Sequence, residues 1–202
     1  MSDDGLFPER IETERLRLER LCRENLPPLE LYEHANADAP SIDEVTRYVT
    51  WDPHRTPKES RDFLVRMEEA WDDGEAAAYV IRSKEDDAAG EFVGTGGLTL
   101  DWDRRSAELG VWLRKEFWGR GYSGERAGAL MEVAFDRLDL ELVAVSHHVE
   151  NRKSRRAIER YVEAHGGRLD GTFRNFLAFA DGEVADVDRY TVTREQWREK
   201  TR

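Results

Sequence analysis

The sequence predicts an α/β (α+β) domain with a mixed, mostly antiparallel sheet flanked by helices. Segments with the two-residue alternation of strands are followed by segments with the repeat of amphipathic helices. The connections between the early strand segments are short, as antiparallel pairing allows. A glycine-rich stretch at residues 118–125 joins a strand to a helix. The chain of 202 residues suits one domain, 1–202, with a sizeable core.

The first half of the chain contains both strand and helix signals. Leu16 and Leu18 alternate with arginines, which indicates a strand with one solvated face. Thr56-Pro57-Lys58-Glu59 begins a helix, because it combines a capping box with a proline at the first helical position. Gly74 is a typical stop for that helix. The other elements expected here are a short helix at 25–34 and strands at 77–81 and 92–100.

The second half predicts two more strands, two helices and a hairpin. In the strand at 107–113, one face carries Ala107, Leu109, Val111 and Leu113. The run at 142–146 is continuously apolar, as in a strand that is covered on both faces. Asp181-Gly182 is a turn signal for a closing hairpin. The remaining elements are a helix carrying Ala127, Leu130, Met131, Ala134, Phe135 and Leu138, a helix carrying Ala157, Ile158, Tyr161 and Val162, and hairpin strands at 172–180 and 185–193.

The charge balance disfavours polyanionic partners. The chain has 43 acidic against 31 basic side chains and a net charge of −12. A surface of that sign repels nucleic acid and anionic membranes, so we expect no direct nucleic-acid binding and no membrane association. Only five of the basic residues are lysines. An acidic, lysine-poor surface is typical of halophilic proteins but also occurs in ordinary cytosolic ones, and both interpretations stay open.

Cysteine usage and the N-terminus favour a cytoplasmic location. Cys22 is the only cysteine, which excludes an internal disulfide and fits a reducing compartment. Met1-Ser2-Asp3-Asp4 is acidic, and no apolar stretch of the signal-peptide type follows it. No apolar run approaches the ~18 residues of a transmembrane helix.

The stretch Trp118-Gly119-Arg120-Gly121-Tyr122-Ser123-Gly124-Glu125 is the strongest functional signal. Its glycines let backbone N–H groups turn toward a ligand. The N-terminus of the helix that follows adds a partial positive charge. Together these features suit a phosphate or a pyrophosphate.

Two common phosphate ligands do not fit the surroundings of this stretch. Gly119, Gly121 and Gly124 satisfy the dinucleotide pattern G-x-G-x-x-G, but that pattern alone is weak. The acid it requires belongs at the carboxyl end of the next strand, whereas Glu141 precedes the run beginning at Leu142. The chain also lacks G-x-x-x-x-G-K-[ST], which argues against a P-loop NTPase.

Three motifs in this order resemble the GNAT superfamily of N-acetyltransferases. They are Ala107-Glu108-Leu109-Gly110-Val111-Trp112-Leu113, the glycine stretch, and Asn151-Arg152-Lys153-Ser154. More narrowly, the chain is similar to the RimJ/RimL-type (ribosomal-protein-alanine N-acetyltransferase-like) branch. Leu169-Asp170-Gly171 and Asp186-Val187 match two further motifs of that branch.

The resemblance implies an enzyme that uses acetyl-CoA as co-substrate and no metal. Central parallel strands at 107–113 and 142–149 would splay apart and admit the pantetheine arm. The acetyl group would pass directly to a primary amine, either a protein N-terminus or a small molecule. The residues implied at acetyl-CoA are Trp112 and Leu113 at the pantetheine and thioester, Gly119, Arg120, Gly121, Tyr122, Ser123 and Gly124 at the pyrophosphate, and Asn151, which either bonds the pantetheine or caps a helix.

Basic residues near both helix starts agree with a phosphate-bearing ligand. Arg114, Lys115, Arg120 and Arg126 surround the glycine stretch in sequence, and several more basic residues follow Asn151. Cations at those places favour the phosphates of CoA. A solvated basic helix face is the structural alternative.

Two residues are the candidates for proton transfer. Glu108 is the predicted general base, because it lies on the strand beside the proposed thioester and points away from the apolar residues. Ser154 is the counterpart of a serine that the resemblance implies as proton donor to the thiolate. Each has a structural alternative: a polar-face glutamate and a capping serine. The tyrosine that other acetyltransferases use as the acid is replaced by Ile158, and Tyr161 lies nearly one turn further on.

Other residues carry weaker signals. His147 and His148 end the second splayed strand, where one of them must face away from the site. They lack the spacing of a zinc site. Trp51 and His54 fall where the resemblance implies an acceptor pocket. A non-catalytic CoA-binding sensor or assembly protein on the same fold is the rival functional class, and it would not need Glu108 or Ser154.

Overall fold

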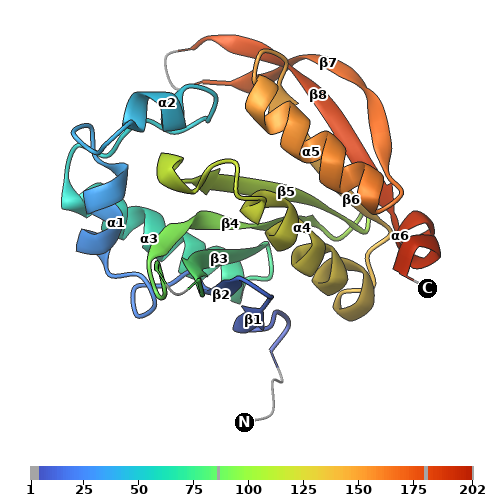
Figure 1. Ribbon diagram of the computed structural model, residues 1–202, viewed down its shortest axis with the longest axis horizontal. Coiled ribbons are helices and arrows are strands. Elements are labelled where there is room, and N and C mark those ends of the chain that lie inside the picture. Colours follow the sequence, from blue (N-terminus) through green and yellow to red (C-terminus); the bar gives the residue numbers. More distant parts are fainter. Residues whose placement is uncertain (1–4, 86, 180–181, 202) are drawn as a thin grey trace.

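The computed structural model describes residues 5–85, 87–179 and 182–201. Its strands are β1 (Arg10–Glu12), β2 (Leu16–Arg20), β3 (Ala76–Ser83), β4 (Phe92–Asp101), β5 (Ser106–Leu113), β6 (Leu142–His148), β7 (Arg168–Ala178) and β8 (Val184–Thr193). They form one sheet in the order β1-β2-β3-β4-β5-β6-β8-β7 (Figure 1). Each pair of neighbours is antiparallel except β5 with β6, which is parallel. The mixed, mostly antiparallel sheet predicted from the sequence is confirmed.

Helices cover both faces of this sheet (Figure 1). They are α1 (Pro28–Ala35), α2 (Ile42–Thr46), α3 (Pro57–Asp72), α4 (Tyr122–Glu132), α5 (Arg152–Ala164) and α6 (Arg194–Thr201), with a 3-10 turn at Lys115–Phe117 and a π-helical turn at Val133–Arg137. On one face, Leu31 of α1 and Leu64 of α3 pack with Val80 of β3. On the other face, residues of α4 and α5 such as Leu130 and Ile158 belong to the larger core.

Helix α3 begins at Pro57 as predicted, but its capping differs from the expected box. Among the described residues, no side chain caps the backbone at Thr56. The Thr56 hydroxyl instead donates to Glu59 at 3.4 Å, and the Glu59 carboxylate accepts the Arg55 N–H at 2.9 Å. The helix ends at Asp72, and Gly74 follows with φ +73°, a conformation that favours glycine.

The sequence-based assignment missed three short elements and reached beyond the described residues at two places. Strand β1 and helices α2 and α6 were not predicted. Met1 to Asp4, Ala180 at the end of the predicted hairpin strand, and Asp181 of the predicted turn lie outside the described residues. Gly182 of that turn has φ +92°, as the turn signal requires. In the part of the chain that the structure describes, no helix has the length and apolarity to cross a membrane.

The parallel pairing of β5 with β6 stops after three residue pairs. Ser106, Ala107 and Glu108 pair with 142–144, and the ladder ends there although both strands continue. The two strands therefore splay, as expected. The divergence also uncovers the end of the apolar face of β5: Val111 is 38% exposed because it lies beyond the last pair.

Candidate active site

The divergence of β5 and β6 opens a cleft of about 950 Å³. Its walls come from the ends of both strands, from the first turns of α4 and α5, and from the segment between α2 and α3. Beyond Glu108, the edge of β5 that faces β6 pairs with no strand in the described part of the chain. Backbone N–H and C=O groups without a ladder partner can bind an extended ligand as an added strand would. The cleft is therefore suited to a long, amide-containing ligand.

The glycine stretch lies at one end of this cleft. Gly119 has φ +79° and Gly121, the N-cap residue of α4, has φ +85°. Among the described residues, no side chain caps the N-terminus of α4. A Cβ atom on Gly119 would meet no other atom within 4 Å, so the turn borders open space. An uncapped helix N-terminus beside open space fits an anionic group such as pyrophosphate.

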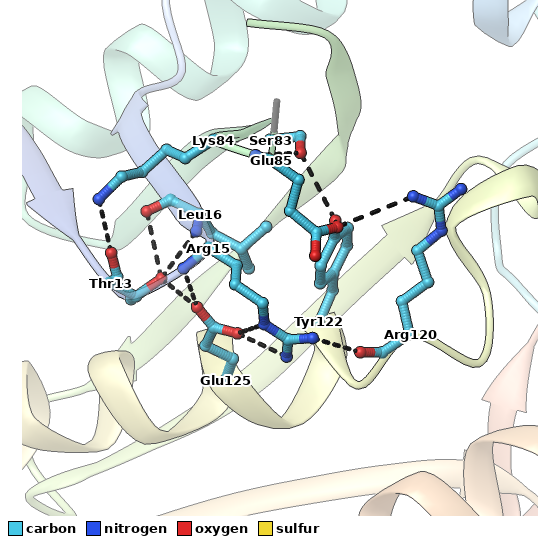
Figure 2. Close-up of polar contacts among 9 residues, drawn as sticks. All are labelled: Thr13, Arg15, Leu16, Ser83, Lys84, Glu85, Arg120, Tyr122 and Glu125. Atoms are coloured by element: carbon cyan, nitrogen blue, oxygen red, sulfur yellow. Dashed lines mark hydrogen bonds and ion pairs between the residues drawn. The ribbon is translucent and has the colours of Figure 1, made fainter. Parts of the chain in front are cut away.

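A polar cluster holds the glycine stretch against the start of β2 (Figure 2). The Glu125 carboxylate accepts hydrogen bonds from the Thr13 hydroxyl at 2.6 Å, the Arg15 backbone N–H at 2.7 Å and Arg15 Nε at 2.8 Å. Arg15 Nη1 in turn donates to the carbonyl oxygen of Arg120 at 2.9 Å. The position of the turn is thus fixed by a segment about a hundred residues earlier in the chain.

Opposing effects act on the pKa of the Glu125 carboxyl. Burial alone would raise this pKa, but the hydrogen bonds from Thr13 and Arg15 together outweigh burial and hold it below its usual value. Glu125 is therefore ionised at neutral pH and pairs with the Arg15 guanidinium at 2.7 Å.

The side chains of Tyr122 and Arg120 both have partners within the protein. The Tyr122 ring is buried, stacks on Phe117 with 6.1 Å between centroids, and its hydroxyl donates to Glu85. Only backbone atoms of Tyr122 are left for a ligand. The Arg120 side chain is partly exposed and lies 3.8 Å from the Glu85 carboxylate. It can reach a phosphate if it leaves this weak surface pair.

At the start of α5, Asn151 rather than Ser154 caps the helix. Asn151 Oδ1 accepts the backbone N–H of Ser154 at 3.1 Å. Both residues line the cleft, and so does Ser123 of α4. The capping alternative for Ser154 is therefore wrong, and its hydroxyl makes no hydrogen bond within the described residues. Asn151 has the capping role that the sequence left open.

Trp118 connects the two helix starts with β5. Its Nε1 donates to the carbonyl oxygen of Leu113 at 2.8 Å. Lys153 Nζ lies over the same indole ring, 4.5 Å from the centroid. Lys153 and Lys115 both pair with Glu44 of α2, so part of the basic charge near the cleft is already neutralised.

Glu108 lies where the two strands begin to diverge but is not among the residues that line the cleft. Its carboxylate is 3.3 Å from Arg189 Nη1 of β8. The Glu108 side chain is 39% exposed, so it keeps access to solvent. The Arg189 guanidinium also lies over the rings of Phe173 and Phe176, at 6.0 and 5.8 Å. Glu108 is therefore adjacent to the cleft and held by an ion pair.

Aromatic side chains line the part of the cleft that lies next to α3. Trp112 lies 5.5 Å from Trp51, measured between ring centroids, and both line the cleft. His54 packs on Trp51 at 6.0 Å, and its Nδ1 is 2.7 Å from the Ser60 hydroxyl. Burial lowers the pKa of His54.

The two consecutive histidines of β6 have different neighbours, but both line the cleft, so the expectation that one of them faces away from it is wrong. His147 is buried and stacks on Tyr190, whereas the His148 ring lies 4.9 Å from Tyr48. Within the described ranges, no group of three or more histidine, cysteine, aspartate or glutamate side chains is arranged to hold a metal ion.

Comparison with known proteins agrees with this geometry. Residues 15–161 match the family model described as the acetyltransferase (GNAT) domain. The chain belongs to the GNAT family. It is similar to the "Uncharacterized N-acetyltransferase p20" of Bacillus licheniformis, with 26% identity over 190 residues, which is 94% of this chain and 98% of that protein. This GNAT chain is therefore an N-acetyltransferase, and its family carries out acetyl-CoA-dependent N-acetylation.

Two solved structures show the same fold. The microcin C7 self-immunity acetyltransferase MccE, in complex with acetyl-CoA and AMP, has a TM-score of 0.78 at 19% identity, covering 95% of this chain and 99% of that one. RimL, a ribosomal alpha-N-protein acetyltransferase, has a TM-score of 0.75 at 20% identity, covering 92% and 94% of the two chains. At these identities the likeness establishes the GNAT fold.

Sequence reasoning placed Arg126 among the cations available to the phosphates of CoA, and the structure contradicts this. Arg126 is completely buried on α4, and Nη1 donates to the carbonyl oxygen of Gly110 at 3.0 Å. Its Nε and Nη2 atoms have no hydrogen-bond partner among the described residues. The sequence did hold a signal: Arg126 lies four residues before Leu130 and eight before Ala134, which places an arginine on the apolar stripe of the helix.

Proposed function

We propose that this GNAT acetyltransferase transfers the acetyl group of acetyl-CoA directly to a primary amine. The observation that carries the proposal is the continuity of the cleft with the glycine stretch. An anion-binding helix N-terminus adjoins the unpaired edge of β5, as a ligand with a pyrophosphate and a diamide arm requires. The backbone of Gly119, Gly121, Tyr122, Ser123 and Gly124 would bind the pyrophosphate, helped by Arg120. Backbone groups of Trp112 and Leu113 would pair with the pantetheine.

The residues around the cleft supply the chemistry of the transfer. Glu108 would accept the proton of the amine, directly or through one water molecule. The amine nitrogen then attacks the thioester carbonyl carbon, while a β5 backbone N–H stabilises the carbonyl oxygen. The C–S bond breaks, its electron pair stays on the sulfur, and the Ser154 hydroxyl donates a proton to that sulfur and regains one from solvent. The Ser154 role is supported by its place in the cleft wall and by the capping role of Asn151.

The acceptor class is the finer part of the proposal. The part of the cleft next to α3 has an aromatic lining, formed by Tyr48, Trp51 and Trp112. Such a lining suits the apolar part of an amine substrate. A protein N-terminus is the first acceptor to test, since the name of RimL describes an alpha-N-protein acetyltransferase. A small amine is the second.

The decisive experiment is thermal unfolding with and without acetyl-CoA, in low and in multimolar KCl, with NADH as the control ligand. Acetyl-CoA at ~100 times its dissociation constant should add about 2.7 kcal/mol to the stability of the native state. NADH should add none. A panel of peptides and small amines then reports transfer by mass. The absence of any acetyl-CoA effect on folded protein would reject the proposal, and binding without transfer to any amine would favour the sensor class.

A further inference from the structure

The buried guanidinium of Arg126 is a charge without a counter-charge. Arg126 is 0% exposed, and no ion pair joins it to a carboxylate in the described part of the chain. Within the described ranges, the N–H groups on Nε and Nη2 donate to no acceptor, and the carbonyl oxygen of Gly110 accepts from Nη1. Burial lowers the pKa of Arg126, although an arginine remains protonated. Such a group destabilises the apoprotein unless something else pairs with it.

Its position places this charge directly behind the wall of the cleft. The side chain passes over Gly96 of β4, where a Cβ atom would lie only 3.0 Å from Arg126 Cδ and 2.9 Å from the carbonyl oxygen of Gly110. Gly96, Gly110 and Val111 all line the cleft. No side chain at positions 96 and 110 therefore separates the guanidinium from a ligand on β5.

Tyr161 is another buried polar group on this wall. It lines the cleft and interacts electrostatically with the Arg126 guanidinium. Burial raises the pKa of Tyr161 to about 12. That is well above the pKa of about 8.5 of a thiol, so Tyr161 is a weak proton donor to a departing thiolate. The Ser154 hydroxyl is an alcohol and a weaker acid than a thiol, so its proton reaches the sulfur only after the C–S bond has broken. A sulfur that leaves through this cleft therefore carries negative charge before a proton reaches it.

On the basis of the proposed function, we propose that Arg126 stabilises the negative charge on the CoA sulfur as the C–S bond breaks. The electron pair of that bond stays on the sulfur, the amine proton goes to Glu108, and the acetyl carbon gains the bond to nitrogen. Arg126 neither donates nor accepts a proton in this step. It acts from behind the wall as a fixed positive charge in a region of low dielectric, which is effective because no reorganisation is needed during the reaction.

The first test uses the protein without substitution. The pKa of the CoA thiol is measured by pH titration of free and of protein-bound CoA, with the ultraviolet absorbance of the thiolate as the readout. Binding to the protein should lower the thiol pKa, and one unit of lowering corresponds to a tenfold gain in CoA affinity at high pH. CoA whose thiol is replaced by hydrogen should bind with no such pH dependence. An unshifted thiol pKa in bound CoA overturns the inference. If CoA and acetyl-CoA do not bind at all, the proposed function fails first.

The second test compares Arg126→Met with Arg126→Lys, and Arg198→Met on the exposed face of α6 serves as the control. Arg126→Met should keep or raise the unfolding temperature, because it removes an unpaired buried charge. It should keep its affinity for acetyl-CoA, lose about tenfold or more in kcat and raise the thiol pKa of bound CoA. Arg126→Lys should recover part of both losses. An unchanged kcat and thiol titration in a folded Arg126→Met overturn the inference. A loss of kcat that is fully explained by a smaller folded fraction of Arg126→Met also overturns the inference.

Discussion

Glu125 and Arg15 join two distant parts of the chain at the glycine stretch. One Glu125 oxygen accepts the Arg15 backbone N–H at 2.7 Å, and the other accepts Arg15 Nε at 2.8 Å (Figure 2). The same guanidinium donates to the carbonyl oxygen of Arg120, within the turn itself, at 2.9 Å. The backbone that is proposed to bind the pyrophosphate is therefore positioned by β2 as well as by its own glycines.

We predict that Glu125→Gln weakens both the fold and acetyl-CoA binding. The amide cannot replace the charge-assisted bonds to Arg15, so the free energy of unfolding should fall by about 1–3 kcal/mol. Because the folded-state pKa of Glu125 lies below its ordinary value of 4.5, the stability from its charge is present above that pH and is lost as the pH falls through the folded-state pKa. Urea unfolding between neutral and acid pH measures the stability and its pH dependence, and thermal shift with acetyl-CoA measures the binding.

The control for this prediction is Glu132→Gln, at an exposed position of the same helix. It should leave the unfolding free energy and its pH dependence unchanged. Equal stability of Glu125→Gln and wild type at neutral pH would show that the Arg15 contact does not hold the turn.

Gly121→Asp should abolish acetyl-CoA binding while leaving the protein folded. Gly121 has φ +85°, which aspartate and asparagine tolerate better than most residues, and an added Cβ would meet only Arg15 Nη2, at 3.4 Å. The new carboxylate repels the pyrophosphate. Gly121→Asn has the same shape without the charge and should retain more affinity. Acetyl-CoA titration by thermal shift compares them, and equal affinity of the two variants would place the pyrophosphate elsewhere.

Ser154→Ala and Asn151→Ala should separate chemistry from helix capping. Asn151 caps α5, so Asn151→Ala should lower stability by about 1 kcal/mol. Ser154 contributes only its backbone N–H to that cap, so Ser154→Ala should keep the unfolding temperature and the KM for acetyl-CoA while kcat falls. Steady-state kinetics beside thermal unfolding measures the contrast. An unaltered kcat in Ser154→Ala would remove Ser154 from the mechanism.

Glu108→Gln should lower kcat by about a hundredfold or more, because a positioned general base typically contributes that much. The stabilisation by acetyl-CoA should stay, since Glu108 does not line the cleft. The exposed substitution Glu91→Gln should change neither quantity. A Glu108→Gln variant with wild-type kcat would assign Glu108 to the ion pair with Arg189 alone, and the base would have to be sought elsewhere.

Local sequence signals predicted most elements of the fold. The β2, β3, β4, β5 and β6 segments have strand alternation or continuous apolar runs, and Gly74 and Pro57 mark the ends of α3. The short β1, α2 and α6 were missed, because segments of three to eight residues hold too little periodicity to stand out. The capping of α5 by Asn151 was one of two open alternatives, because side-chain geometry decides between them.

The sequence by itself determined the family, the anion-binding turn and the strand–turn–helix order around it. Those features depend on glycine conformation and on periodicities within a few residues. Tertiary structure alone decided the contact between Arg15 and Glu125, the ion pair of Glu108 with Arg189, and the burial of Arg126 behind Gly96 and Gly110. Each of these joins segments that are far apart in the chain. Their energies depend on distance, burial and the space that a neighbouring strand leaves, which become fixed only when the sheet and its helices pack together.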